Sequence, residues 1–143
     1  MKHIVIEFAT KQDLQFLQKN TDITGDLLDR KLKYQEILIA KVEDRQVGFL
    51  IFEYLWSHIP FIAQIWIHAD YRKKGIGKSL LNYFEKYLRE NNYTILLSSS
   101  MENAIEAQAW HKHMGFKDSG LISKINDDNT DEVFFRKSLE RDS

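Results

Sequence analysis

The sequence predicts one α/β domain in which a mixed sheet is combined with helices, an architecture also described as α+β. Its length of 143 residues suits a single compact core. Apolar segments with the period of strands outnumber those with the period of helices, and the two kinds alternate in mixed order. A single proline, Pro60, and the absence of repeats or low-complexity tracts leave nothing typical of a linker. We therefore assign residues 1–143 to one domain of about seven strands and four helices.

The first elements are a strand and two short helices. Residues 2–8 alternate around Ile4, Ile6 and Phe8, as a strand does. Thr10 suits the N-cap of the helix that follows, in which Leu14 and Leu17 lie on one face. A second short helix is expected at about residues 24–34.

The rest of the chain contains a hairpin, three further strands and two helices. Residues 36–56 predict two antiparallel strands joined by a turn at residues 43–45, although the turn lacks an Asn-Gly pair. The elements expected after it are a strand at 61–68, a helix at 75–91, a strand at 93–100, a helix at 104–114, and strands at 115–123 and 131–138.

Composition excludes several classes of protein. A formal net charge of −1 gives no overall attraction to nucleic acid or to an acidic membrane, so any anion site must be local. The absence of cysteine removes disulfides, thiolate metal sites and a cysteine nucleophile, and it fits a cytoplasmic protein. The apolar run at residues 4–6 is too short for a signal peptide or a membrane span.

The segment Tyr71–Leu81, "YRKKGIGKSLL", predicts an anion site at the start of a helix. The helix has an apolar face that packs on a sheet, which fixes the position of its N-terminus. Free backbone N–H groups and the positive end of the helix dipole bind anions there. Gly75 and Gly77 let an anion approach the backbone. The alternative interpretation is a glycine-rich loop beside a solvated basic face.

Two familiar phosphate motifs do not fit this segment. A P-loop requires glycine where this chain has Arg72. The dinucleotide-binding fingerprint requires glycine where this chain has Leu80. The anion is therefore held in another way.

The segment resembles the coenzyme A loop of the GNAT superfamily of N-acetyltransferases, with the motif Arg/Gln-x-x-Gly-x-Gly/Ala. Arg72, Gly75 and Gly77 match that motif. The resemblance covers nearly the whole chain, because the order of elements is similar, "IWIHADYR" resembles the strand before the loop, and "AWHKHMGF" resembles the late helix. It implies the GNAT-type acyl-CoA N-acyltransferase fold.

The resemblance implies acetyl-CoA as the cosubstrate, no metal, and direct attack by a primary amine of a small molecule or peptide. The backbone N–H groups of the loop would hold the pyrophosphate, and the preceding strand would pair with the pantetheine arm, leaving a backbone N–H for the oxyanion. The implied coenzyme-binding residues are Ile65, Trp66, Ile67, Arg72, Lys73, Lys74, Gly75, Ile76, Gly77, Lys78 and Asn103.

A base must deprotonate the amine, whose pKa is about 10.4 in lysine. Relatives often use a glutamate on a strand near the acyl group, but residues 96–100 here read Leu-Leu-Ser-Ser-Ser. Glu53, His58 and His68 are the remaining candidates, and a surface or structural role is the alternative for each.

The departing thiolate needs a proton, which many relatives take from a tyrosine four residues before Gly-Phe. That position is His111. With an unperturbed pKa, roughly a quarter of a histidine is cationic at pH 7. The alternative is that His111 only fills the space of the tyrosine. Ala104 stands where the family has asparagine and Asn103 lies one residue earlier, which indicates an insertion in this segment.

The acceptor is not identified by the sequence. The rings that are candidates for its pocket, with core packing or a homodimer contact as alternatives, are Trp56, His58, Phe61 and Trp66. Asp22 and Asp26 lie where relatives often bind the acceptor. Two other functions remain open: a non-catalytic acyl-CoA binding module, and a partner-binding protein with a vacant loop.

Overall fold

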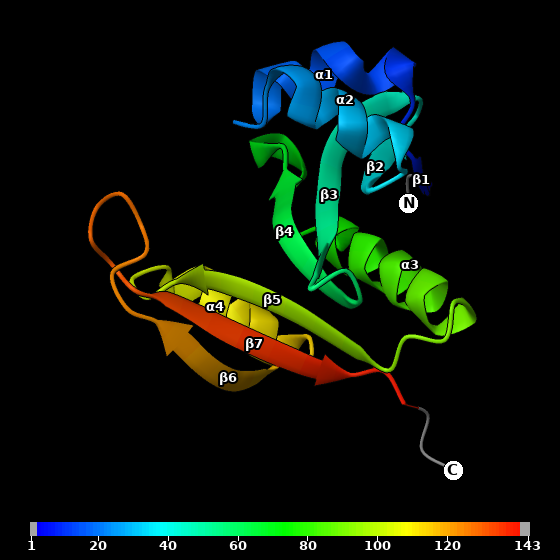
Figure 1. Cartoon of the computed structure of the whole chain (residues 1–143). Coiled ribbons are helices and arrows are strands. Elements are labelled where there is room, and N and C mark those ends of the chain that lie inside the picture. The colour runs from blue at the N-terminus through cyan, green and yellow to red at the C-terminus, as the bar shows by residue number, and fades with distance from the viewer. Residues whose placement is uncertain (1–2, 141–143) are drawn as a thin grey trace. The chain divides into compact units, whose positions relative to one another are not determined.

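The computed structural model describes residues 3–140 and contains a seven-stranded sheet with the strand order β1-β2-β3-β4-β5-β7-β6 (Figure 1). The strands are β1 (Ile4–Phe8), β2 (Ile37–Val42), β3 (Arg45–Leu55), β4 (Ile59–Ile67), β5 (Ile95–Met101), β6 (Lys117–Ile122) and β7 (Glu132–Ser138). The helices are α1 (Leu14–Asn20), α2 (Gly25–Lys33), α3 (Ile76–Glu90) and α4 (Ile105–His113), with 3-10 turns η1 (Lys11–Asp13) and η2 (Ala69–Tyr71). The mixed α/β class that the sequence predicts is confirmed.

The chain divides into two compact units. One comprises the residues up to Phe52 together with Gln64–Lys86, and the other comprises Glu53–Ala63 together with the residues from Tyr87 onward. The strands β3 and β4 and the helix α3 each contribute residues to both units. The assignment of the whole chain to a single domain stays a prediction.

In the first unit, the two-residue turn between β2 and β3 differs from the turn that the sequence predicts. Glu43 and Asp44 both have positive φ, 52° and 65°, which is the backbone of a type I′ hairpin turn. Arg45 is therefore the first residue of β3 and not part of the turn. The sequence lacks the Asn-Gly signal because Glu and Asp occupy the left-handed positions instead.

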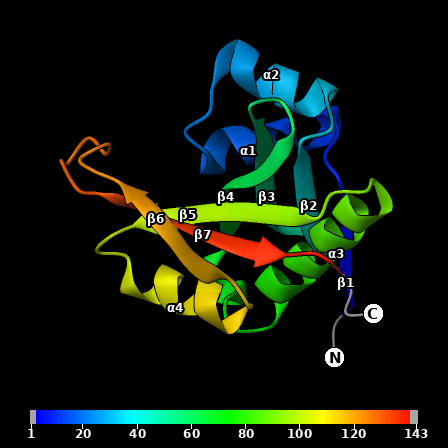
Figure 2. The ribbon, with the colours of Figure 1, turned by 60° about the horizontal axis from the view of Figure 1, so that its bottom comes forward.

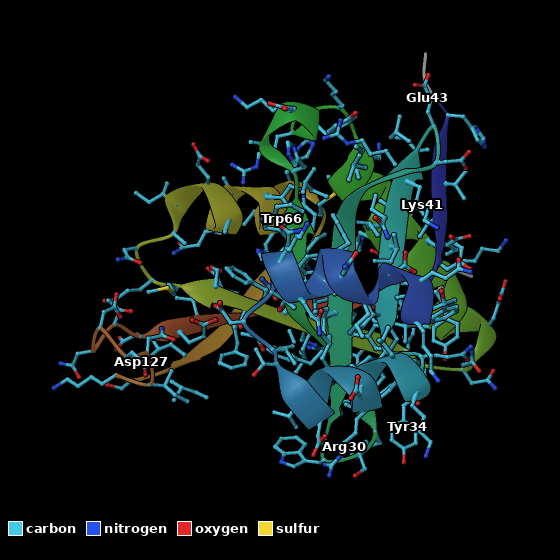
Figure 3. The ribbon with its side chains drawn as sticks, turned by 90° about the horizontal axis from the view of Figure 1, so that it is seen from above. Arg30, Tyr34, Lys41, Glu43, Trp66 and Asp127 are labelled. Atoms are coloured by element: carbon cyan, nitrogen blue, oxygen red, sulfur yellow. The ribbon has the colours of Figure 1, made fainter. Side chains whose placement is uncertain are left out.

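The strands of the first unit bury apolar side chains on both of their faces. One face packs under α1 and α2, which Figure 3 shows lying over β2 and β3. Its buried members are Ala9, Leu17, Leu28, Ile37, Ile39, Phe49 and Ile51. On the other face the ring of Phe52 lies 4.3 Å from that of Phe84 in α3, where Leu80 and Leu81 are also buried. The apolar period of α3 thus gives the sheet-packing face that the sequence predicts.

The second unit contains β5, β7 and β6, and Figure 2 shows α4 beside these strands. β7 pairs antiparallel with both neighbours, from Ile95 opposite Ser138 to Met101 opposite Glu132 on the β5 side. β5 also pairs in parallel with β4, at Phe61 opposite Leu97 and Ile62 opposite Ser98. Alternate residues of β5 are buried, so Ser98 and Ser100 share the buried face with Leu96.

Within residues 3–140, no helix is both long enough and apolar enough to cross a membrane.

Candidate functional site

The segment that follows β4 is held by local hydrogen bonds in the first unit. The strand ends at Ile67, and His68, which the sequence places in the strand, instead caps η2 because its Nδ1 accepts a hydrogen bond from the Asp70 N–H at 3.1 Å. The Nε atom of Arg72 donates to the Ile67 carbonyl at 3.1 Å. Arg72 therefore ties the segment after η2 back to the end of the strand.

The residues Arg72–Lys78, named here the anion loop, end at the start of α3. Gly75 has a φ of +82° and its carbonyl accepts from both the N–H and the Oγ of Ser79, each at 3.0 Å. Because this is the first intrahelical bond, the N–H groups of residues 76–78 lie ahead of it and have no partner in the helix. A Cβ on Gly75 would meet nothing within 4 Å, so glycine is required there by backbone conformation and not by space.

The anion loop carries positive charge that no acid neutralises. Lys73, Lys74 and Lys78 are exposed, and none of them forms an ion pair in the part of the chain that the structure describes. Together with the helix start, these lysines suit an anion, and the anion site itself stays a prediction.

Gly48 in β3 allows the close approach of β4, and the sequence analysis missed it. A Cβ on Gly48 would lie 2.8 Å from the carbonyl oxygen of Trp66 and 2.8 Å from the Cδ1 of Ile67. An isolated glycine within a strand pattern is the signal that could have found it. Gly48 therefore positions the same residues, Ile65–Ile67, that the resemblance assigns to the pantetheine arm.

His111 in α4 is buried in the second unit, with both ring nitrogens in hydrogen bonds. Its Nδ1 lies 2.7 Å from the Ala107 carbonyl oxygen, and its Nε2 lies 2.7 Å from the Oγ of Ser98. Because a carbonyl only accepts, Nδ1 carries the proton in the neutral ring, and Nε2 accepts from the Ser98 hydroxyl. The ring also stacks on that of Phe135, with centroids 4.5 Å apart.

Burial lowers the pKa of His111, and the hydrogen bond to Ala107 opposes that effect only in part. The expectation that roughly a quarter of His111 is cationic at pH 7 is therefore too high. The sequence could not reveal this because the burial depends on contacts from β5 and β7.

Ser98 and Ser100 replace the glutamate that the sequence analysis sought on β5. Ser98 is the hydrogen-bond partner of His111, a role the sequence analysis missed. The Oγ of Ser100, a residue only 8% exposed, has no hydrogen-bond partner among the residues that the structure describes. A buried hydroxyl without a partner is unfavourable, so a water or a ligand group at Ser100 would lower the free energy.

The family model for the acetyltransferase (GNAT) family matches residues 6–116. The chain belongs to the GNAT family. Among curated proteins, an uncharacterized N-acetyltransferase of Methanocaldococcus jannaschii is 28% identical over 102 residues. That match covers 69% of this chain and 64% of the relative, so the chain spans less than two thirds of the relative's length.

Solved structures give the same GNAT fold. Ard1 from Thermoplasma volcanium superposes with a TM-score of 0.86 at 16% identity, over 96% of this chain and 99% of that one. The yncA protein of Salmonella typhimurium, solved with its cofactor acetyl-CoA, has a TM-score of 0.80 at 16% identity, over 99% of this chain and 96% of that one. Both comparisons support the fold that the sequence resemblance implies.

The other residues that the GNAT resemblance suggested are divided between the two units. Ile65–Ile67 and the anion loop share the first unit. Glu53, Asn103 and His111 belong to the second. Glu53 and Asn103 are exposed, the latter in the turn before α4.

The remaining histidine candidates for a GNAT base have structural contacts. His58 is exposed in the turn between β3 and β4, where its Nδ1 lies 2.8 Å from the Trp56 carbonyl oxygen. His68 uses Nδ1 to cap η2, which leaves Nε2 as its other ring nitrogen. Neither contact prevents a proton transfer at Nε2.

The aromatic candidates for an acceptor pocket differ in their surroundings. Trp66, labelled in Figure 3, stacks on Phe49 with ring centroids 5.5 Å apart and packs against the core of the first unit. These contacts match the core-packing alternative for Trp66. Phe61 stacks on Phe134 at 5.8 Å. Trp56, in contrast, is 79% exposed. Asp22 and Asp26 are also exposed, as expected for residues that could meet a cationic amine.

Proposed function

We propose that this chain transfers the acetyl group of acetyl-CoA to a primary amine of a small-molecule or peptide acceptor. The anion loop carries this proposal, because it combines the N–H groups of a helix start with three lysines that form no ion pair within residues 3–140. Membership of the GNAT family and the acetyl-CoA in the similar yncA structure support the choice of coenzyme.

In this proposal the anion loop holds the pyrophosphate through backbone N–H groups, and its lysines add charge. Arg72 keeps the loop against the end of β4 by its bond to Ile67. The backbone of Ile65–Ile67 pairs with the pantetheine arm, and Asn103, in the turn before α4, is the further candidate for a coenzyme contact. A backbone N–H near the thioester stabilises the oxyanion when the amine attacks.

Two proton transfers complete the proposed reaction. Glu53 takes the amine proton, directly or through water, and the Nε2 atoms of His58 and His68 are the other candidates. The thiolate takes its proton from the pair formed by His111 and Ser98. Because the neutral His111 ring carries its proton on Nδ1 and accepts at Nε2, this donation requires the imidazolium form, whose Nε2 proton passes to the Ser98 Oγ while the Ser98 hydroxyl proton passes to the thiolate.

The first experiment measures thermal unfolding with acetyl-CoA and, separately, with ATP and magnesium. A ligand at about one hundred times its dissociation constant adds about 2.7 kcal/mol, so acetyl-CoA should raise the melting temperature by about 5 to 10 °C. ATP should raise it much less. A larger shift with ATP would contradict the coenzyme assignment.

The second experiment incubates the protein with acetyl-CoA and a panel of primary amines, with mass detection of acetylated products and measurement of free thiol. An acetylated amine supports the proposal. Coenzyme binding without turnover of any amine would favour the non-catalytic acyl-CoA module. Absence of both would favour a partner-binding protein in which the loop is vacant.

A further inference from the structure

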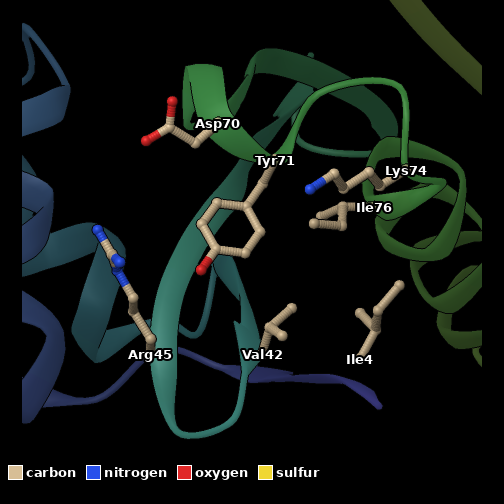
Figure 4. Close-up of a pocket in the computed structure, with 7 residues that line it drawn as sticks. All are labelled: Ile4, Val42, Arg45, Asp70, Tyr71, Lys74 and Ile76. Carbon is tan, nitrogen blue, oxygen red and sulfur yellow. The ribbon is translucent and has the colours of Figure 1, made fainter. Parts of the chain in front are cut away.

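A cavity of about 480 Å³ lies beside the anion loop within the first unit (Figure 4). Its volume falls in the range of small-molecule sites, which is about 300–1,000 Å³. The residues that line it, from β1, β2, β3, η2, the anion loop and α3, are Ile4, Val42, Arg45, Asp70, Tyr71, Lys74 and Ile76. The proposed coenzyme contacts include only Lys74 and Ile76 of this set, so the cavity has its own chemistry.

The cavity has an apolar floor. Val42 and Ile76 are buried, 5% and 2% exposed, and Ile4 is partly buried. Three branched side chains around one space favour a ligand with an apolar body, because the ligand's own apolar surface leaves water when it lies against them.

Two cationic side chains, Arg45 and Lys74, lie near the ring of Tyr71. The guanidinium carbon of Arg45 lies 5.7 Å from the ring centroid and the Nζ of Lys74 lies 5.5 Å from it. Figure 4 shows Tyr71 between these two side chains. Neither cation forms an ion pair within residues 3–140, so each keeps its capacity to bind an anion.

The cavity contains one acid, Asp70, whose Oδ2 lies 3.8 Å from the Nδ1 of His68. The lining residues therefore carry two positive charges against one negative charge. A cationic amine would meet Arg45 and Lys74, so this cavity does not suit the acceptor of the proposed reaction. An inorganic anion would use the cations but not the apolar floor.

We propose that this cavity is a second ligand site, which binds an organic monocarboxylate with a compact apolar body such as an aromatic acid. The carboxylate pairs with Lys74, Arg45 adds positive potential from the other side of the Tyr71 ring, and the apolar body lies against Ile4, Val42 and Ile76. The site shares Lys74 and Ile76 with the proposed coenzyme contacts, but the binding of the carboxylate does not depend on the coenzyme assignment.

The test is a titration of the full chain with 2-naphthoate, followed by NMR of the methyl groups of isoleucine and valine. Saturable shifts are expected at Ile4, Val42 and Ile76. The neutral 2-naphthamide, which has the same rings, should bind about tenfold or more weakly because it leaves both cations without a charged partner. Inorganic phosphate should leave the three methyl groups unshifted.

The 2-naphthoate affinities of three substitution variants test whether the ligand binds in this cavity. Lys74→Met should weaken 2-naphthoate binding about tenfold or more, since it removes a charge-assisted hydrogen bond. Arg45→Met should weaken it by a smaller factor, about threefold, since Arg45 acts on the carboxylate through charge from the other side of the Tyr71 ring. Lys33→Met is the matched control: Lys33 stands 5.8 Å from the ring of Tyr34 and lines a different cavity. It changes the net charge equally and should change the affinity less than about twofold. Methyl signals elsewhere in the spectrum report whether each variant is folded.

Three results would overturn the proposal: no saturable shift at Ile4, Val42 and Ile76, equal affinity for 2-naphthoate and 2-naphthamide, or equal effects of Lys33→Met and the two cavity variants. Shifts confined to the amides of the anion loop and abolished by coenzyme A would also overturn it, because they would assign the carboxylate to the loop.

Discussion

The Nε2 atom of His111 lies 2.7 Å from the Oγ of Ser98, and this bond joins α4 to β5 inside the second unit. The other ring nitrogen bonds to the Ala107 carbonyl, so the imidazole is held from both sides and flat against Phe135. One side chain thus combines a packing role that the geometry shows with a proton-donor role that the family resemblance implies.

The first prediction concerns the structural role of that bond. His111→Phe should lower the free energy of unfolding by about 1–3 kcal/mol, because it leaves the buried Ser98 hydroxyl without its partner. Urea unfolding measures the change. Ser98→Ala, combined with His111→Phe, is the control: the double variant should be more stable than the sum of the two single effects predicts. Strictly additive effects would show that the bond contributes nothing.

The second prediction concerns catalysis. If His111 and Ser98 supply the thiolate proton, His111→Phe should lower turnover about a hundredfold or more while coenzyme binding persists. His111→Tyr should restore part of the rate, because a phenol with a pKa near 10 stays protonated and can donate. Steady-state kinetics on an amine found by the panel measure this. Unchanged turnover in the Phe variant, where chemistry limits the rate, would leave packing as the role of His111.

The third prediction is a pH dependence of stability. Burial lowers the pKa of folded His111 below the value of about 6.5 in the unfolded chain. In the pH range between those two values the unfolded chain binds the proton more tightly. The contribution of the buried neutral ring to the free energy of unfolding is therefore complete above about pH 6.5. That contribution is lost as the pH falls below this value.

Urea unfolding of the parent and of His111→Phe, at a series of pH values from about 7.5 to 5, isolates this effect, since subtraction cancels the other titrating groups. The stability advantage of the parent should shrink as the pH falls. A constant difference across the range would contradict the lowered pKa.

The fourth prediction concerns Gly48. Gly48→Ala places a Cβ against the Trp66 carbonyl oxygen. This atom belongs to the backbone, so no change of side-chain rotamer can relieve the contact. We expect a loss of about 1–3 kcal/mol in unfolding free energy and weaker acetyl-CoA binding, because β4 must shift. Gly77→Ala, in the first turn of α3, serves as a comparison and should not destabilise the fold. Equal stability of the Gly48 variant and the parent would show that β4 moves without cost.

The fifth prediction concerns the anion loop. Gly77→Asp should abolish coenzyme binding while the fold survives, because a carboxylate at a helix start stabilises the helix but repels the pyrophosphate. Calorimetric titration with acetyl-CoA measures the affinity. The Gly77→Ala variant adds the Cβ without the charge and so separates the steric effect from the electrostatic one. A folded Asp variant with the affinity of the parent would put the anion elsewhere.

Local patterns in the sequence predicted much of this protein. Thr10 caps the first helical turn, because its side-chain oxygen accepts a hydrogen bond from the Gln12 N–H. The Asp13 carboxylate in turn accepts a hydrogen bond from the Thr10 N–H. Leu17 is fully buried, as its helical spacing indicated. These features depend on residues a few positions apart, so hydrogen bonds and periodicity within one element suffice to predict them.

The errors in the predicted secondary structure lie at the ends of strands. Arg45 and His68 fall on the other side of their predicted boundaries, because backbone turns and a side-chain cap decide where a strand stops. A single residue in a left-handed conformation or one histidine nitrogen changes such a boundary, and neither alters the apolar pattern.

The sequence by itself determined the fold class, the family resemblance and the position of the anion loop, because apolar periodicity and glycine spacing act over short stretches of chain. Only the tertiary structure decided that Ser98 binds His111, that burial lowers the pKa of that ring, and that Gly48 makes room for Trp66. It also brought Arg45 and Lys74 to one tyrosine ring. Each of these depends on contacts between segments far apart in the chain, and desolvation and steric exclusion arise only when those segments pack.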